Sequence, residues 1–378
     1  MLPIFDKNFY FKKPANLVKY YLSKQYVKLY SKDRFVAVCG SLGKTTTVRF
    51  SQKVLSQKFK TFSTQSDKDH LFEVTSALLK INPSYKKVIL EFGGLLGEMD
   101  FYSSIILPKI VIVTNINQDE VFNETNKLLS QLPSDGIAML NWDDAFCKKL
   151  SKEINATVIY YGTDPQNCTV WAGNAKIENF KTTFELNLGV ERVKVELSTL
   201  GIHQIYPALA AATLGVVSNI PLTKIKIALE STEGQDHKMQ FHQGPNGSFL
   251  LDDTYSSSPI ELDFAIDTLL QIPARRRILI LGEMNNSIKY SPEDFRKIAE
   301  KIYKEKLDFV YLGQGFIKNV LDELKSLGFW EEKIEANLQN SQLVAKLLNS
   351  LGKGDVCLIK GSKAVRLDEV VKRIAKKI

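Results

Sequence analysis

Hydrophobic residues in the first half of the chain form short continuous runs, and helix-like segments separate the earlier runs. Strands that are apolar at nearly every position are typical of a parallel sheet covered by helices on both faces. We therefore predict an α/β fold for this half of the chain. Its sheet is expected to contain strands at Phe35–Cys39, Lys87–Phe92, Ile110–Thr114, Ile137–Leu140 and Val158–Tyr161.

The pattern changes between residues 168 and 200, where threonines are frequent and polar and apolar residues alternate, as in Thr182–Leu186. Alternation with a period of two predicts a small antiparallel section. The alanine-rich segment Leu200–Val217 that follows is apolar nearly throughout and predicts a buried helix.

A second series of strands and helices begins near residue 233 and predicts a second doubly wound domain. The organisation we expect is a helical arm (1–33), a central domain (34–232) and a C-terminal domain (233–378). The second series comprises strands at Phe249–Asp252, Arg277–Leu281, Phe309–Leu312 and Val356–Ile359, and helices at 259–270, 291–306, 316–327 and 364–377.

Residues 15–30 of the arm read as a basic amphipathic helix, with Leu17, Tyr21, Leu22 and Leu29 near one face and lysines between them. Two interpretations stay open. The helix packs on the domain that follows, or it makes peripheral contact with an anionic membrane or polymer.

Composition narrows the class of protein without choosing its function. The 378 residues are 44% hydrophobic and 24% charged, which excludes a largely disordered or fibrous chain. No apolar run reaches the roughly 20 residues of a transmembrane helix, and the first residues lack a signal-peptide pattern. The four cysteines are far apart in the sequence, so we expect neither disulfides nor zinc, and a cytoplasmic location. The net charge of +8 is a weak indication of an anionic partner.

A glycine-containing segment, Gly40–Thr47 (GSLGKTTT), follows the first predicted strand and opens a predicted helix. Glycines let backbone N–H groups approach phosphate, and the start of a helix favours negative charge. Lys44 is expected to reach the β- and γ-phosphates of a nucleotide, and the Thr45 hydroxyl to bind Mg²⁺. ATPases of the partition and nitrogenase-iron-protein type share G-K-T-T, so the loop by itself does not choose the reaction.

Further motifs along the chain resemble those of the Mur ligase family, and most of all its MurF branch, which joins D-alanyl-D-alanine to a UDP-N-acetylmuramoyl peptide. The quoted segments follow one another in family order. They are Glu91–Gly94 with Gly97–Met99, Pro108–Ile116, Leu132–Ala138, Gly201–Gln204 with Ala210-Ala211, Lys238-Met239, Asp252–Pro259, Leu281–Met284 and Lys360–Lys363.

This resemblance implies a fold and a reaction. The fold is a central P-loop ATPase domain with a parallel sheet, followed by a Rossmann-like domain that closes over ATP. In the reaction a substrate carboxylate attacks the γ-phosphate of ATP, and an amine then displaces phosphate from the acyl phosphate. Such a site must neutralise phosphate charge and exclude water from the intermediate. ATP, Mg²⁺, a carboxylate donor and an amine acceptor are the implied ligands.

The resemblance also assigns roles to residues of this chain. Lys44, Glu91, Asn115 and Lys360 are the implied catalytic group, and Thr45, Glu91 and Glu120 the implied metal ligands. Some residues also have a structural alternative. Glu91 would be an ion-paired glutamate, Asn115 and Asp253 would cap turns, and His203, in the same motif as Gln204, would be a structural histidine. The implied nucleotide contacts are Gly40, Gly43, Lys44, Thr45, Thr46, Gln204, Lys238, Asp253 and Tyr255.

The chain departs from the family pattern on the acceptor side. Glu120 stands where the family has a histidine at a second metal site, and Phe295 stands where another histidine is expected. Thr125 occupies the counted position of a carbamylated lysine, with Lys127 two residues away. Residues 1–33 are too few for the family's UDP-binding domain, so we predict that this domain is absent.

Three functions therefore remain. The first is an ATP-dependent amide ligase that resembles MurF and acts on a cell-wall peptide precursor. The second is a ligase of the same superfamily with another substrate, similar to folylpolyglutamate synthetase or to a polymer-forming enzyme. The third is a non-catalytic ATP-binding module. We expect a monomer, and no nucleic-acid partner, because no arginine-rich segment or aromatic-interleaved basic patch is present.

Overall fold

The structure is a computed structural model that describes residues 13–64, 70–93, 96–285, 290–315 and 318–376. Parts of some predictions lie outside the described residues. They are the first twelve residues of the arm, Gly94 of the Glu91–Gly94 motif, residues 316–317 of one predicted helix and residue 377 of another.

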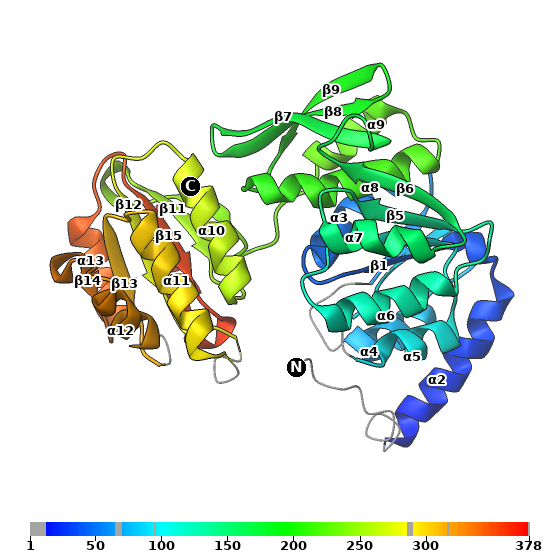
Figure 1. Cartoon of the computed structure of the whole chain (residues 1–378), viewed down its shortest axis with the longest axis horizontal. Helices are drawn as coiled ribbons and strands as arrows, with labels where there is room; N and C mark the ends of the chain where they lie inside the picture. The colour runs from blue at the N-terminus through cyan, green and yellow to red at the C-terminus, as the bar shows by residue number, and fades with distance from the viewer. Residues whose placement is uncertain (1–12, 65–69, 94–95, 286–289, 316–317, 377–378) are drawn as a thin grey trace. The chain divides into compact units, whose positions relative to one another are not determined.

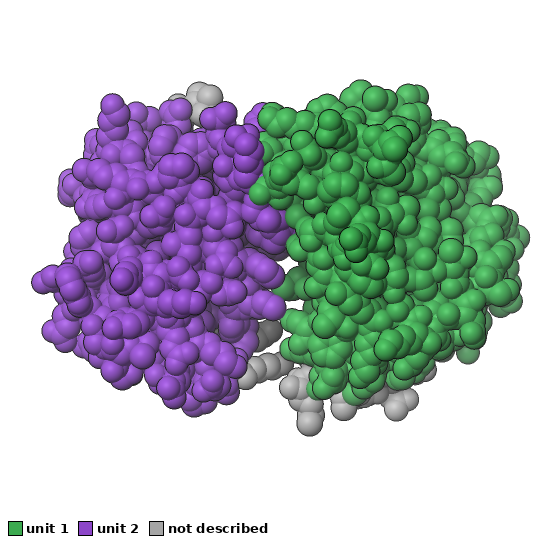
Figure 2. Space-filling model, turned by 45° about the horizontal axis from the view of Figure 1, so that its top comes forward, with its two compact units in different colours: residues 1–175, 183–197, 204–232 green, residues 176–182, 198–203, 233–378 purple. Residues whose placement is uncertain are grey.

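The chain forms two compact units, which Figure 2 shows in different colours. Unit 1 comprises residues 1–175, 183–197 and 204–232. Unit 2 comprises residues 176–182, 198–203 and 233–378. The chain crosses for the last time from unit 1 to unit 2 between Thr232 and Glu233. The expected domain bounds stay a prediction.

Unit 1 is built on a sheet with the strand order β2-β3-β1-β4-β5-β6-β7-β8-β9 (Figure 1). Neighbours from β2 to β7 pair in parallel. The turns between β7, β8 and β9 are two residues long, as in antiparallel hairpins, and residues 176–182 count with unit 2. The strands are β1 Phe35–Cys39, β2 Thr61–Ser63, β3 Lys87–Glu91, β4 Ile110–Val113, β5 Ile137–Asn141, β6 Thr157–Gly162, β7 Val170–Glu178, β8 Lys181–Leu188 and β9 Glu191–Leu197.

Helices cover both faces of the parallel part of this sheet (Figure 1). All five residues of β1 are buried, as a strand between two helical layers requires. Ala37 and Cys39 belong to a core cluster with Phe101 and Leu128 of the helices. The helices are α2 Pro14–Tyr26, α3 Lys44–Leu55, α4 His70–Leu78, α5 Glu98–Ile105, α6 Asp119–Ser130, α7 Ala145–Leu150, α8 Ile205–Val217 and α9 Leu222–Glu230.

Helix α2 packs on the rest of unit 1, but not through the face that its sequence suggested. Asn16 and Ser23 are buried, and the Tyr20 ring lies against Phe101 with centroids 5.4 Å apart. The Tyr26 hydroxyl donates to the carbonyl of Ile81 at 2.7 Å. The expectation that this helix packs on the following domain is therefore confirmed, and the tyrosines and small polar residues of one face make the contacts. The predicted apolar residues are exposed: Leu17 39%, Tyr21 56%, Leu22 55% and Leu29 76%.

Unit 2 has a six-stranded sheet in the order β10-β11-β15-β12-β13-β14, in which only the β10–β11 pair is antiparallel among the described strands. Alternate residues of its strands belong to two core clusters, with Leu251 in one and Leu250 in the other. The elements are β10 Gln240–Gln243, β11 Phe249–Asp253, β12 Arg277–Leu281, β13 Phe309–Leu312, β14 Ile334–Glu335, β15 Val356–Lys360, α10 Pro259–Gln271, α11 Pro292–Lys304, α12 Lys318–Ser326, α13 Asn340–Ser350 and α14 Leu367–Ile374.

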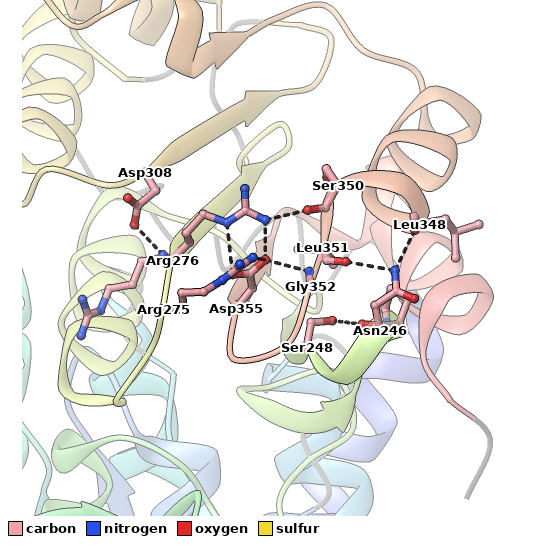
Figure 3. Close-up of polar contacts among 12 residues, drawn as sticks. Asn246, Ser248, Arg275, Arg276, Asp308, Leu348, Ser350, Leu351, Gly352 and Asp355 are labelled. Atoms are coloured by element: carbon pink, nitrogen blue, oxygen red, sulfur yellow. Dashed lines mark hydrogen bonds and ion pairs between the residues drawn. The ribbon is translucent and has the colours of Figure 1, made fainter.

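A buried carboxylate ties together the starts of β12 and β15 in unit 2 (Figure 3). The Asp355 side chain is fully buried and accepts hydrogen bonds from Arg275 Nε at 3.0 Å and Arg276 Nε at 3.1 Å. It also accepts from the backbone N–H of Gly352 at 2.8 Å. These donors outweigh burial and lower the pKa of Asp355 to about 2.

We predict that Asp355→Asn makes the protein less stable at neutral pH and flattens the acid end of its stability profile. The folded-state pKa lies below the ordinary value of 3.8, so the carboxylate contributes stability above that value. That contribution, about 2 kcal/mol, is lost as the pH falls through about 2. Urea unfolding of both proteins across this range should show their difference shrinking on acidification. A difference that stays constant with pH would contradict this role of Asp355.

Candidate active site

The phosphate loop of unit 1 has the predicted strand–loop–helix form. Strand β1 ends at Cys39 and helix α3 begins at Lys44. Gly40 and Gly43 have φ angles of +125° and +77°, values that favour glycine. The loop therefore ends at a helix N-terminus, where backbone N–H groups can receive an anion.

The end of β4 holds this loop in place. The backbone N–H of Ser41 donates to the carbonyl of Asn115 at 2.8 Å, and that of Leu42 donates to Asn115 Oδ1 at 2.8 Å. A Cβ atom on Gly40 would lie 2.4 Å from Thr114 Oγ1 and 2.7 Å from the Asn115 carbonyl oxygen. In this structure Asn115 thus caps the loop, which is the structural alternative foreseen for it. A direct contact of Asn115 with substrate stays a prediction.

Lys44 lies over the loop from the first turn of α3. Its Nζ donates to the carbonyls of Gly40 at 2.9 Å and Ser41 at 3.1 Å. Burial lowers the pKa of Lys44, and the charge of Glu91 acts in the opposite direction. An anionic phosphate bound by the loop would favour the charged ammonium further.

Thr45 and Glu91 meet beside the loop. Thr45 Oγ1 donates to Glu91 Oε1 at 3.1 Å, and Glu91 is only 3% exposed at the end of β3. A hydroxyl and a carboxylate oxygen side by side are the donors that Mg²⁺ prefers, and this ion usually completes its shell with phosphate and water. The two residues therefore fit an Mg²⁺ ion bound together with a nucleotide.

The second metal site has less support from the geometry. Among the described residues, no group of three or more His, Cys, Asp or Glu side chains is arranged to hold a metal ion. Glu120 lies in the first turn of α6, and its metal role stays a prediction.

Neither candidate position in α6 suits carbamylation, which needs an uncharged lysine amine. Thr125, at the counted position, is buried and lies beside the Cys39 thiol. Lys127 Nζ pairs with Glu124 Oε1 at 2.6 Å, and this hydrogen bond raises the pKa of Lys127.

Glu124 is a residue of this region that the sequence interpretation missed. It is fully buried, and besides pairing with Lys127 it accepts from the backbone N–H of Met99 at 3.3 Å. A signal was available, because Glu124 shares a helical face with Val121 and Leu128, and a carboxylate on an apolar face needs a partner.

In unit 2, two predicted site residues form an ion pair where neighbouring parallel strands end. Asp253 and Lys360 are register partners at the ends of β11 and β15. Lys360 Nζ donates to Asp253 Oδ2 at 2.6 Å and to the carbonyl of Ser256 at 2.9 Å. The other carboxylate oxygen of Asp253 accepts from the backbone N–H of Met239 at 3.2 Å. The carboxyl ends of the strands are where ligands bind in open α/β sheets.

Lys238 and Tyr255 also meet in unit 2. Lys238 Nζ lies 4.6 Å from the centroid of the Tyr255 ring, and Lys363 Nζ lies 5.8 Å from the same centroid. Lys363 belongs to the Lys360–Lys363 motif but was given no role from the sequence. The three side chains form a basic and aromatic cluster that suits a nucleotide.

His203 has the structural surroundings that were foreseen for it. Its ring stacks on Phe264 with centroids 5.2 Å apart, and burial lowers its pKa to about 4, so the imidazole is neutral at pH 7. Gln204, expected to contact the nucleotide, is the N-cap residue of α8 in unit 1. Phe295 is buried in the core of unit 2 and provides no polar group.

Two family models match the chain in order. The model of the Mur ligase middle domain matches residues 38–215, and the model of the Mur ligase glutamate ligase domain matches residues 237–363. The chain belongs to the Mur ligase family. Its fold class is that of the family, with a P-loop domain followed by a C-terminal ligase domain.

Similar proteins carry the name MurF or the corresponding activity. UDP-N-acetylmuramoyl-tripeptide–D-alanyl-D-alanine ligase from Buchnera aphidicola is 26% identical over 353 residues, which cover 90% of this chain and 75% of the relative. MurF from Acinetobacter baumannii has a similar fold, with a TM-score of 0.83, 20% identity and coverage of 94% of this chain and 79% of that one. MurF from Thermotoga maritima in complex with ADP also has a similar fold, with a TM-score of 0.78 at 20% identity. The match covers 94% of this chain and 82% of that one.

Proposed function

We propose that this protein is an ATP-dependent carboxylate–amine ligase of the MurF type that acts on a cell-wall peptide precursor. The observation that carries the proposal is the pairing of Thr45 with buried Glu91 beside Lys44 and the phosphate loop, in a chain of the Mur ligase family. This arrangement provides phosphate binding and a metal position together, as transfer of the γ-phosphate to a carboxylate requires.

In unit 1, the residues bind and polarise the triphosphate. The loop N–H groups and Lys44 neutralise charge on the β- and γ-phosphates. Thr45 and Glu91 would hold Mg²⁺, which when bound supplies further positive charge to the phosphoryl oxygens. Asn115 keeps the loop in its anion-binding shape. The substrate carboxylate then attacks the γ-phosphorus, forming an acyl phosphate and releasing ADP.

In unit 2, we assign Asp253 to the ribose and Lys238 and Tyr255 to the nucleotide. Lys360 holds Asp253 in position through their ion pair. Attack of the incoming amine on the acyl carbon gives a tetrahedral intermediate, and phosphate leaves from it.

The proposal also covers the ligands, the compartment and the oligomeric state of the enzyme. Its ligands are ATP, Mg²⁺, a peptide carboxylate and an amine, in a cytoplasmic enzyme that works as a monomer without nucleic acid. All four cysteines are free and buried, which accords with a reducing compartment. No described helix has the length and apolar character needed to cross a membrane.

The test measures release of ADP and phosphate with a UDP-N-acetylmuramoyl tripeptide and D-alanyl-D-alanine. We expect turnover only when both the carboxylate and the amine are present. Full turnover without amine would contradict a ligase. Turnover with L-glutamate instead of D-alanyl-D-alanine would favour the folylpolyglutamate synthetase-like alternative, and nucleotide binding without any product would favour a non-catalytic module.

We also expect this activity to be independent of carbon dioxide. Thr125 cannot be carbamylated, and the raised pKa of Lys127 leaves little of the uncharged amine that reacts. Turnover should be equal in buffers depleted of bicarbonate and in buffers enriched with it, and Lys127→Gln should retain it. Rescue of a depleted sample by bicarbonate would show that a lysine carbamate is required.

A further inference from the structure

Helix α2 leaves a set of large apolar side chains exposed, although it packs on the rest of unit 1. Its buried positions include Asn16 and Ser23, at 5% and 0% exposure. Leu17, Val18 and Leu22 are 39%, 55% and 55% exposed. A helix normally buries its apolar stripe against the domain that carries it. Here tyrosine rings, Tyr20 and Tyr26 among them, pack on the core of unit 1 beside the buried polar residues, and the apolar stripe is exposed.

The exposed stripe is continuous along the helix. Leu17, Val18, Tyr21 and Leu22 follow the spacing that brings residues together on one helical face. Leu29, in the short helical turn that follows α2, is 76% exposed. Half of the ten exposed large hydrophobic residues of the described chain therefore lie within residues 17–29. In Figure 1 this helix lies at the periphery of unit 1.

Lysines flank the stripe, and no acidic residue accompanies them. Residues 13–32 contain five lysines and neither Asp nor Glu. Within the described chain, none of these lysines forms an ion pair with a carboxylate. The next acidic residue, Asp33, is already paired with Lys109 at 3.0 Å. The five lysines are Lys13, Lys19, Lys24, Lys28 and Lys32.

We propose that α2 is a peripheral membrane-binding helix that lies on an anionic lipid surface. An interfacial helix needs an apolar stripe that enters the headgroup region, with lysines beside it that contact anionic headgroups. Tyr21 adds an aromatic side chain with a polar tip, which suits that boundary. This inference does not depend on the proposed ligase activity.

Vesicle flotation with the full chain tests the proposal. We expect binding to vesicles of phosphatidylcholine mixed with phosphatidylglycerol to be at least about tenfold stronger than to phosphatidylcholine alone, and to weaken with salt. Equal binding to both vesicles, or none to either, would overturn it.

A matched pair of double variants separates this helix from general surface effects. Leu22→Gln with Lys28→Gln removes one exposed leucine and one exposed lysine from α2 and the turn after it. Ile227→Gln with Lys224→Gln removes an equivalent pair from α9, where Ile227 is 58% exposed. The first variant should lose about tenfold in binding to anionic vesicles and the second should keep it, with unchanged thermal unfolding in both. Equal loss in the two variants would contradict a role for α2.

A fluorescent label distinguishes the possible occupants of the stripe. Because the four native cysteines are buried, Leu22→Cys introduces an accessible thiol for an environment-sensitive dye. We expect polar emission in solution and a blue shift when anionic vesicles are added. Blue-shifted emission already in solution would show that the chain itself, or a second copy, covers the stripe. Sedimentation would then tell these two apart, and either result would overturn the membrane assignment.

Discussion

Replacing Gly40 by alanine is expected to remove nucleotide binding and to destabilise unit 1 by roughly 3–5 kcal/mol. Two effects add. The φ angle of +125° belongs to a region that L-residues rarely adopt, and the new Cβ would lie 2.7 Å from the carbonyl oxygen of Asn115. Thr114 Oγ1, at 2.4 Å, can rotate away, but the backbone carbonyl cannot, so the loop itself must move.

Movement of the loop explains why binding should suffer more than stability alone would suggest. The N–H groups of Ser41 and Leu42 are held on Asn115, and they shift with the loop. Because a displacement of about 1 Å at such a site costs on the order of a hundredfold, we expect nucleotide affinity to fall by at least that factor. Titration with a fluorescent ATP analogue measures the affinity, and urea unfolding measures the stability.

Two other glycines serve as controls for the Gly40 variant. Gly189 has a φ of +55°, and no atom of a described residue lies within 4 Å of the place that an alanine methyl group would take, so Gly189→Ala isolates backbone strain away from the loop. Gly43 has a φ of +77°, and a Cβ atom placed there would lie 3.5 Å from Pro207 Cγ, an ordinary contact distance. Each of these two alanine variants should lower the free energy of unfolding by about 1–2 kcal/mol. If Gly40→Ala were no worse than Gly189→Ala in stability, the close approach to Asn115 would not constrain the loop.

The sequence predicted the strands correctly where they lie between two layers of helices. Burial on both faces makes β1 and β4 apolar throughout and β3 apolar at its three central positions, so their runs stand out from the helices around them. The edge strand β2 was missed, since three residues with one buried position leave no such run. Helix α13 was missed too, because only Leu343 and Leu347 of its eleven residues are buried.

The candidate site was predictable in position but not in its pairings. The site residues follow strands, and parallel order brings the ends of those strands together, as for Thr45 with Glu91. Asn115 caps the loop because β4, the strand before it, lies beside β1. No local sequence pattern shows which strand takes that place. Helix α2 is a further example. Its periodicity predicts an apolar face, but no local pattern shows which face packs against the rest of unit 1.

Replacing Lys360 by methionine is expected to destabilise unit 2 by about 3–5 kcal/mol, although methionine fills a similar volume. Lys360 is 1% exposed, and its ammonium is the cation paired with the largely buried carboxylate of Asp253 at 2.6 Å. Without the ammonium, Asp253 keeps only the N–H of Met239 among its hydrogen bonds described above. A buried carboxylate without its counter-charge is costly, so the loss comes mainly from the partner left behind rather than from the pair itself.

A double-mutant cycle tests whether the loss comes from the unpaired carboxylate of Asp253 or from lost packing around residue 360. Asp253→Leu combined with Lys360→Met removes both charges, so the double variant should be more stable than Lys360→Met alone. Urea unfolding of the four proteins gives the coupling. Additive losses would mean that the two residues contribute independently. Affinity for ATP should be weak in all three variants, because the proposed ribose contact needs the Asp253 carboxylate and Lys360 to orient it. The double variant therefore separates the two roles of the pair, recovering the fold without recovering the nucleotide site.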